Sequence, residues 1–189
     1  MIIELPNYIN ENTVISISEQ LRPHLPQNKT NSYNREGRTI NISKKEELKD
    51  LDVQLHDIFS KLQASVIASR YKPEPAFSSG DTGYEYHLYD PQDICHVHND
   101  GEVVFYKETP NSTLLRYASV ILHLNTVHEG GELVFPAQNK KIKTELGKVI
   151  IFPPYGTHQH YTTPSNEPRE VIVSWFVYNS ITVHKNGNT

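Results

Sequence analysis

The chain lacks long apolar runs, clusters of basic residues and all but one cysteine. Cys95 has no second cysteine for an internal disulfide, which fits a reducing compartment, and we expect a cytoplasmic protein. No run approaches eighteen consecutive apolar residues, and the N-terminus has no basic segment before an apolar one, so we expect neither export nor a membrane partner. The formal net charge is −4 without a Lys/Arg-rich stretch, so nucleic acid is not an expected partner.

Helical patterns occupy the first part of the chain. The stretch 43–46 (SKKE) has the form of a capping box, and after it apolar residues recur at helical spacing as far as Val66. This pattern predicts a helix that lies against a sheet and ends before the prolines at 73 and 75. A shorter helix is expected at about 12–25, and the polar segment 28–38 between the two helices is expected to be mobile.

Short strand-like runs separated by turn residues fill the remainder. A length of 189 residues favours a single domain, 1–189, with a helical N-terminal part at 1–72 and a strand-rich core at 84–178. Many short, evenly spaced strands are typical of a jelly roll, and the apolar strands 114–124 and 169–178 should be central. We therefore expect a mostly β protein, a cupin-like double-stranded β-helix with supporting α-helices packed on one sheet. The predicted strands are 84–89, 94–99, 102–106, 114–124, 132–135, 140–145, 148–152, 158–163 and 169–178.

Two short histidine patterns point to a metal site. His96, His98 and Asp100 alternate, so in a strand they would project from one face. Two imidazoles and a carboxylate form the facial triad typical of non-haem Fe(II) oxygenases. We expect the third ligand of this triad to come from a distant segment, where His158 and His160 repeat the alternation. The other histidines lack such company, and we expect structural roles for His24, His56, His87, His123, His128 and His184.

Further motifs follow in a fixed order. The stretch 129–135 reads EGGELVF, 147–153 reads GKVIIFP, and Arg169 follows His160 by nine residues, ahead of Trp175. The order Y-x-P, H-x-D, GGELVF, G-x-x-I-I-F-P, H, P, R and W resembles the prolyl 4-hydroxylase-like group of Fe(II)/2-oxoglutarate-dependent dioxygenases. The resemblance covers about 84–178, half of the chain.

Residue by residue, the resemblance implies His98, Asp100 and His160 as iron ligands and as the catalytic centre, with His96 and His158 outside the coordination sphere. It implies Arg169 as the residue that binds the distal carboxylate of 2-oxoglutarate. A planar, permanently charged guanidinium suits that task, because it can hold a carboxylate by two parallel hydrogen bonds.

The resemblance assigns two further residues and shows two departures. Tyr89 is expected to contact the co-substrate, and Trp175 to wall the pocket. The glycine that often follows Tyr-x-Pro is replaced by Gln92. The position where some members carry a co-substrate-binding tyrosine holds Leu122, which leaves the other polar contacts to the distal carboxylate open.

The activity that the resemblance implies is hydroxylation of an unactivated C–H bond with O2, as 2-oxoglutarate is converted to succinate and CO2. The expected cofactors are Fe(II) and 2-oxoglutarate, with ascorbate as a candidate addition. The leading substrate is a prolyl residue in a peptide or protein partner, in a Pro-rich segment that could contact the aromatic surface of five tyrosines. Those tyrosines are Tyr33, Tyr84, Tyr86, Tyr106 and Tyr155. Segments 28–38 and 107–113 are expected to act as lids.

Two other interpretations stay open at this stage. His96, His98 and Glu102 also fit the first cupin motif H-x-H-x(3)-E, with His158 as the distal ligand, which predicts a three-His, one-Glu metalloenzyme that does not use 2-oxoglutarate. That interpretation leaves Arg169 and the GGELVF stretch without a role. The third possibility is a catalytically inactive jelly roll that only binds a partner.

Overall fold

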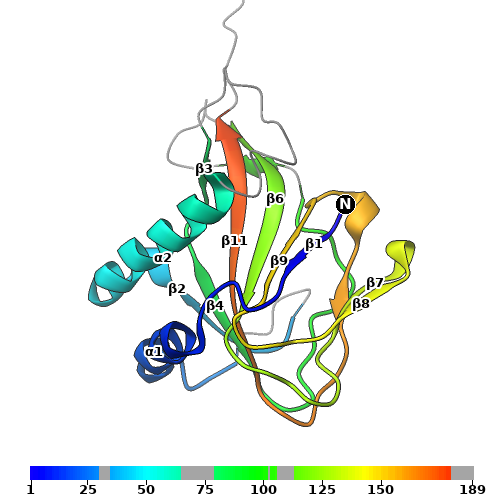
Figure 1. Ribbon diagram of the computed structural model, residues 1–189, viewed down its shortest axis with the longest axis horizontal. Coiled ribbons are helices and arrows are strands. Elements are labelled where there is room, and N and C mark those ends of the chain that lie inside the picture. The colour runs from blue at the N-terminus through cyan, green and yellow to red at the C-terminus, as the bar shows by residue number, and fades with distance from the viewer. Residues whose placement is uncertain (30–34, 65–78, 102, 106–112, 180–189) are drawn as a thin grey trace, which may run out of the picture.

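Two β-sheets form the body of the protein (Figure 1), as expected for a jelly roll. The computed structural model describes residues 1–29, 35–64, 79–101, 103–105 and 113–179. In these residues the larger sheet has the order β1-β9-β6-β11-β4-β2, with β3 paired to β11 and β5 paired to β6, and the smaller sheet has the order β10-β7-β8. The strands are β1 (Ile3–Leu5), β2 (Arg38–Asn41), β3 (Ser79–Asp81), β4 (Glu85–Tyr89), β5 (Val103–Phe105), β6 (Thr113–His123), β7 (Leu133–Phe135), β8 (Lys140–Ile142), β9 (Val149–Phe152), β10 (Tyr161–Thr162) and β11 (Arg169–Asn179).

In the described residues, both α-helices lie on the same side of the larger sheet (Figure 1), which confirms the expected supporting layer. α1 (Glu11–Leu21) and α2 (Lys49–Leu62) are joined by short 3-10 helices at Arg22–His24, Ile42–Lys44 and Glu46–Leu48; two more lie at Pro136–Gln138 and Gly156–His158. The apolar stripes of the helices pack on the sheet and form a first core. Its helical members are Val14, Ile17, Leu21, Leu51, Leu55, Phe59 and Leu62. Among the described helices, none combines the length and apolar character needed to cross a bilayer.

The predicted capping box is wrong. α2 begins only at Lys49, and Leu48 stands at the N-cap without a side-chain hydrogen bond. The hydroxyl of Ser43 instead donates to Asp52 at 2.5 Å and accepts the backbone N–H of Tyr84 at 3.0 Å. Ser43 therefore ties the start of β4 to the helix, a long-range contact that overrides the local motif.

Strands β6 and β11 lie in the middle of the larger sheet and separate two cores, as predicted. On β6, Val120 and Leu122 belong to the core under the helices, whereas Ile121 belongs to a second core that includes residues of the smaller sheet. On β11, Ile172 faces the first core and Val171 the second. This alternation sends every second side chain of both strands toward the space between the sheets, where the site is built.

Some predicted elements differ from the structure. The run 94–99 is not a strand, and its pairing consists of isolated bridges at Cys95 and His98. The run 158–163 shortens to β10, since the 3-10 helix Gly156–His158 precedes it. β1 and β2 were not predicted, and β2 begins at Arg38 in the segment expected to be mobile. Short strands of this kind are stabilised by their partners, which local sequence does not reveal. Val66 and residues 30–34 lie outside the described residues.

A buried carboxylate fastens α1 to the sheet. Glu170 accepts hydrogen bonds from Ser18 at 2.5 Å and Tyr86 at 2.7 Å. It also forms an ion pair with Arg22 at 2.7 Å. Burial alone would raise the pKa of Glu170, but the hydrogen bonds from Arg22, Ser18 and Tyr86 hold that pKa below its ordinary value. The network links helix α1 to strands β4 and β11 through one charge.

We expect Glu170→Gln to lower the free energy of unfolding by about 2 kcal/mol at pH 7, because charge-assisted bonds in a buried site are lost. Since the folded-state pKa is depressed, the contribution of Glu170 is present above its unfolded pKa and is lost as the pH falls through the folded value. Urea denaturation of both proteins at pH 7, 5 and 3.5 measures this. The difference should be equal at pH 7 and 5 and smaller at pH 3.5. A constant difference at all three would contradict the assignment.

Candidate metal centre

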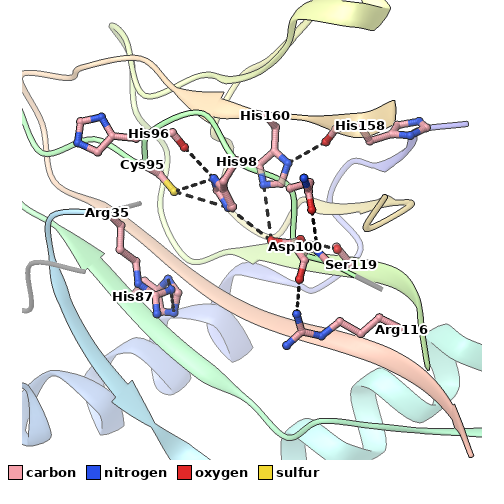
Figure 2. A network of polar contacts seen from close by, with 12 residues as sticks. Arg35, His87, Cys95, His96, His98, Asp100, Arg116, Ser119, His158 and His160 are labelled. Carbon is pink, nitrogen blue, oxygen red and sulfur yellow. Dashed lines mark hydrogen bonds and ion pairs between the residues drawn. The ribbon is translucent and has the colours of Figure 1, made fainter. Parts of the chain in front are cut away.

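Three side chains from two separate segments of the chain converge between the sheets (Figure 2): His98, Asp100 and His160. Each offers one metal-ligand atom, and these atoms lie within 4.8 Å of one another. The backbones of His98 and His160 exchange two hydrogen bonds, of 3.0 and 2.9 Å, so the two imidazoles stand side by side with ring centroids 4.3 Å apart. The alternating histidine patterns thus meet across an antiparallel bridge rather than along one strand.

The hydrogen bonds of the two imidazoles fix which nitrogen is free to bind a metal. Nδ1 of His98 lies 2.7 Å from the carbonyl of His96, and Nδ1 of His160 lies 3.0 Å from the carbonyl of His158. A carbonyl only accepts, so both Nδ1 atoms carry a proton, and Nε2 is in each ring the nitrogen left to bind a metal. The Nε2 atoms lie 3.4 and 3.9 Å from Oδ1 of Asp100. The backbone therefore orients both rings for coordination.

Asp100 is held in a matching way. Its Oδ2 accepts a hydrogen bond from Ser119 on β6, and its backbone carbonyl accepts one from Arg116 (Figure 2). The remaining oxygen, Oδ1, faces the two imidazoles. Two Nε2 lone pairs and one carboxylate oxygen on one side of a centre leave the opposite side open, which is the donor set of a non-haem Fe(II) site.

The electrostatics of the trio favour a cation. Burial would lower the pKa of His98, but hydrogen bonds to Asp100 and Cys95 outweigh it and raise that pKa to about 10. Burial would raise the pKa of Asp100, but His98, His160 and Ser119 hold it well below its usual range. Burial lowers the pKa of His160. The cluster therefore stabilises one positive charge among two imidazoles and a carboxylate, a charge that a divalent metal can supply in place of a proton.

His96 and His158 do not join the trio, and their rings point away from it (Figure 2). His96 is exposed, while His158 is buried with its Nδ1 3.0 Å from the hydroxyl of Thr157. The idea that His96 shares a strand face with His98 and Asp100 was wrong, because 94–99 is not a strand. The described metal-ligand cluster also leaves out both extra histidines of the cupin interpretation, and Glu102 lies outside the described residues.

Arg169, at the start of β11, lines the same pocket as the trio. Its side chain is 4% exposed, its Nε donates to Thr144 at 3.3 Å, and its guanidinium lies 5.1 Å from the ring centre of Tyr89. Within the described part of the chain no carboxylate forms an ion pair with it. Burial lowers the pKa of Arg169 from its ordinary value. A buried cation without an anionic neighbour is costly, and its position suits a ligand that brings its own negative charge.

An apolar sleeve connects Arg169 to the trio. Ile121 of β6, Val171 and Val173 of β11 and Leu133 of β7 line the pocket, with Trp175 toward the metal ligands. Tyr89 lies opposite Arg169 in the pairing of β4 with β11. The pocket thus has the His-Asp-His cluster at one end, apolar walls and a cationic end, which is suited to a small molecule with two different polar ends.

Gln92, which departs from the family pattern, has a structural explanation. Its φ of 70° lies in the left-handed region that favours glycine. Its backbone N–H and Nε2 both donate to the carbonyl of Ser165, at 2.8 and 3.0 Å, and Nε2 also reaches Asn166 at 2.8 Å. These bonds tie the loop before Cys95 to the loop before Arg169, which compensates for the unfavourable φ.

Sequence reasoning missed several residues at the site. Ser119, which holds Asp100, sits in an apolar strand and carries no motif. Arg35 and His87 line the pocket beside Tyr89, with a nitrogen of Arg35 3.0 Å from the ring of His87 (Figure 2). The pairing of β4 with β11 and the bridge between Arg35 and Cys95, both long-range contacts, bring these side chains together. Of the tyrosines expected to face a substrate, Tyr84 and Tyr86 are instead buried in the first core. Tyr33, Tyr106 and the lid segment 107–112 lie outside the described residues.

Comparisons with known proteins agree with this geometry. Residues 84–177 match the family model described as the 2OG-Fe(II) oxygenase superfamily. A search of curated proteins found no match.

Solved structures with similar folds share little sequence with this chain. A viral collagen prolyl hydroxylase from Paramecium bursaria Chlorella virus-1, in complex with 2OG, is 17% identical with a TM-score of 0.65, over 93% of this chain and 95% of that one. A prolyl-4-hydroxylase from Pseudomonas putida is 16% identical with a TM-score of 0.63, over 93% and 91%. A prolyl hydroxylase from Trichoplax adhaerens, in complex with a hypoxia inducible factor peptide, is 15% identical with a TM-score of 0.65, over 93% and 82%. At these identities the likeness shows the fold.

Proposed function

Because this chain belongs to the 2OG-Fe(II) oxygenase superfamily and is a 2-oxoglutarate-dependent dioxygenase, we propose that it hydroxylates a prolyl residue in a peptide or protein. The observation that carries the proposal is one pocket with a two-His, one-Asp donor set at one end and an unpaired buried arginine at the other. No other feature of the described residues unites a metal and an anion site.

The donor set fits Fe(II). His98, Asp100 and His160 would hold the metal through Nε2, Oδ1 and Nε2, with Ser119 orienting the carboxylate. Bound Fe(II) with 2-oxoglutarate supplies the chemistry, in which O2 oxidises the co-substrate to succinate and CO2 and an unactivated C–H bond gains a hydroxyl group. Ascorbate would serve to keep the metal reduced, and it remains part of the proposal alone.

The pocket fits 2-oxoglutarate. The distance from the metal ligands to Arg169 is bridged by apolar walls, so the 2-oxo acid end can face the metal while the distal carboxylate meets the guanidinium. The walls exclude water and thereby strengthen the ion pair. Tyr89, which stacks beside Arg169, fixes the orientation of the guanidinium.

The substrate would enter beside the metal ligands. A second groove is lined by Arg35, Glu85, Asn99, Arg116 and Trp175 and shares His98 and Asp100 with the pocket. The guanidinium of Arg116 lies 4.2 Å from the ring centre of Trp175, which gives the groove a flat, rigid wall of the kind that a prolyl ring can pack against. The prolyl hydroxylase names of the structural neighbours, one of them in complex with a peptide, support this choice. The cytoplasmic location inferred from the single cysteine is a separate prediction, which the groove does not address.

Turnover on peptides tests the proposal. We expect Fe(II)-loaded protein to release succinate from 2-oxoglutarate in the presence of an unstructured prolyl peptide library, with a mass gain of one oxygen in the peptide. Asp100→Ala is the matched control and should give neither product. Succinate release coupled to another side chain or to a free amino acid would contradict the prolyl assignment and keep the oxygenase. Metal-dependent turnover without 2-oxoglutarate would favour the cupin-type enzyme.

A further inference from the structure

Two N–H groups at the junction of the pocket and the groove have no acceptor. Arg35 and Trp175 line both cavities, beside the metal ligands His98 and Asp100. Nε of Arg35 and Nε1 of Trp175 are buried, and within the described residues neither atom has a hydrogen-bond partner. Both groups can only donate. Because a buried donor without an acceptor is costly, this junction is suited to a ligand that brings acceptor atoms.

Positive charge is in excess at the groove. Its arginines and carboxylates are Arg35, Arg116, Glu85 and Asp100. In the proposed complex a divalent metal is balanced by Asp100 and by the carboxylate beside the 2-oxo group, which leaves two arginines against one glutamate. In the view of Figure 2 the guanidinium groups of Arg35 and Arg116 both lie below the metal ligands. A groove with this surplus attracts a negatively charged ligand.

Glu85 is already paired within the protein, so it offers little to a cationic substrate. Nε2 of His87 lies 3.0 Å from Oε2 of Glu85 and donates to it, because a carboxylate only accepts. Nη2 of Arg35 lies 3.6 Å from the same oxygen. These contacts hold the Arg35 guanidinium in place and leave its Nε outside the pair. A lysine or arginine of the substrate would compete with Arg35 for Glu85, whereas a carboxylate would gain a partner.

We propose that this junction binds a carboxylate that lies directly beside the prolyl residue in the substrate. The inference rests on the proposed function, whose substrate class it narrows. The carboxylate accepts from Nε of Arg35, Nε1 of Trp175 meets a further oxygen of the same peptide, and Arg116 adds its positive charge. Because the two cavities meet beside the metal ligands, the carboxylate is close to the reacting C–H bond. That position fits a residue next to the proline better than a distant one.

A peptide series on the wild-type protein measures the preference. The peptides are amidated, unstructured and identical except for the residue before or after a single proline, which is Glu, Gln or Lys. We expect kcat/KM from succinate release to be roughly 10- to 100-fold higher for Glu than for Gln at one of the two positions, as for a hydrogen bond to a charged group. Lys should be the poorest substrate. A peptide that ends in proline, compared with its amide, separates a C-terminal carboxylate from a side chain as the source.

Arg35→Gln tests whether the arginine carries the preference. It removes the charge and keeps a polar side chain, so the ratio of kcat/KM for the Glu and Gln peptides should fall to within about threefold of one. Arg35→Lys, which keeps the charge and loses Nε, should give an intermediate ratio. Arg38→Gln is the matched control, because the Arg38 side chain is 26% exposed like that of Arg35, pairs with Asp90 at 2.6 Å and lines neither cavity. Its ratio should equal that of the wild type.

Two results would overturn the inference. One is equal kcat/KM for the Glu and Gln peptides at both positions, together with equal turnover of the free and amidated C-terminal prolines. The other is an Arg35→Gln variant that loses the same factor on every peptide and keeps the wild-type ratio, because the arginine then serves the co-substrate or the fold. The wild-type series covers the case in which the variant folds poorly. Succinate release with none of the prolyl peptides would contradict the proposed function itself, so the two failures are distinguishable.

Discussion

Asp100→Ala is expected to abolish Fe(II) binding at micromolar metal. The variant removes the only carboxylate of the trio and leaves one partly buried and one buried imidazole, which cannot neutralise a divalent cation. The loss should exceed the roughly 10- to 100-fold that removal of an outer partner costs. Anaerobic Fe(II) titration followed by calorimetry measures it, and His98→Ala and His160→Ala should behave in the same way.

Two variants calibrate this result. Ser119→Ala, which frees Oδ2 of Asp100 but keeps the ligand, should weaken Fe(II) binding by roughly 10- to 100-fold. His96→Ala should leave affinity unchanged, since only its backbone carbonyl contacts the site. If His96→Ala abolished metal binding while Asp100→Ala retained it, the three-His, one-Glu site would replace the trio.

Arg169 is expected to give the second large effect, on the co-substrate rather than the metal. Without its guanidinium the distal carboxylate must enter a dry pocket unpaired, which costs about 2–5 kcal/mol, or roughly 30-fold to several-thousand-fold in affinity. Arg169→Ala should therefore weaken 2-oxoglutarate binding by this factor with nearly unchanged Fe(II) affinity. Arg169→Lys should be intermediate, since an ammonium keeps the charge and loses the two-pronged geometry. Anaerobic titration of the charge-transfer band measures both.

The stability of an Arg169 variant separates a binding role from a structural one. Arg169 is a buried charge without an anionic partner in the described residues. The free energy of unfolding of Arg169→Met should therefore equal that of the wild type or exceed it by up to about 3 kcal/mol, while the affinity for 2-oxoglutarate falls. Arg22→Ala, on the opposite side of the sheet, is the control that should lose stability and keep affinity. Unchanged 2-oxoglutarate affinity in Arg169→Met would remove Arg169 from the site.

Much of the architecture was predictable because the spacing of apolar residues along the chain indicates it. The apolar stripe of α2 and the continuous apolar runs of β6 and β11 each match one period, and tertiary contacts reinforce them. The short strands β1 and β2 have no such signal, since their pairing with β9 and β4 is what makes them strands. The capping-box prediction was wrong for the same reason, because the hydroxyl of Ser43 accepts the backbone N–H of Tyr84, just before β4.

The sequence by itself determined the chemistry of the site. A two-His, one-carboxylate set and a later arginine are specified by residue type and order, and type and order survive any error in secondary structure. The family followed from the same motifs and is confirmed by the match over residues 84–177.

Only the tertiary structure decided how the site is oriented. The carbonyls of His96 and His158 set which imidazole nitrogens face the centre, and the register of β6 against β11 sets which side chains of both strands face the pocket. Side chains in a strand alternate with a period of two, so a shift of one residue moves a side chain to the other face. That shift separates Leu122, in the core under the helices, from Ile121, which lines the pocket, and cross-strand pairing alone fixes it.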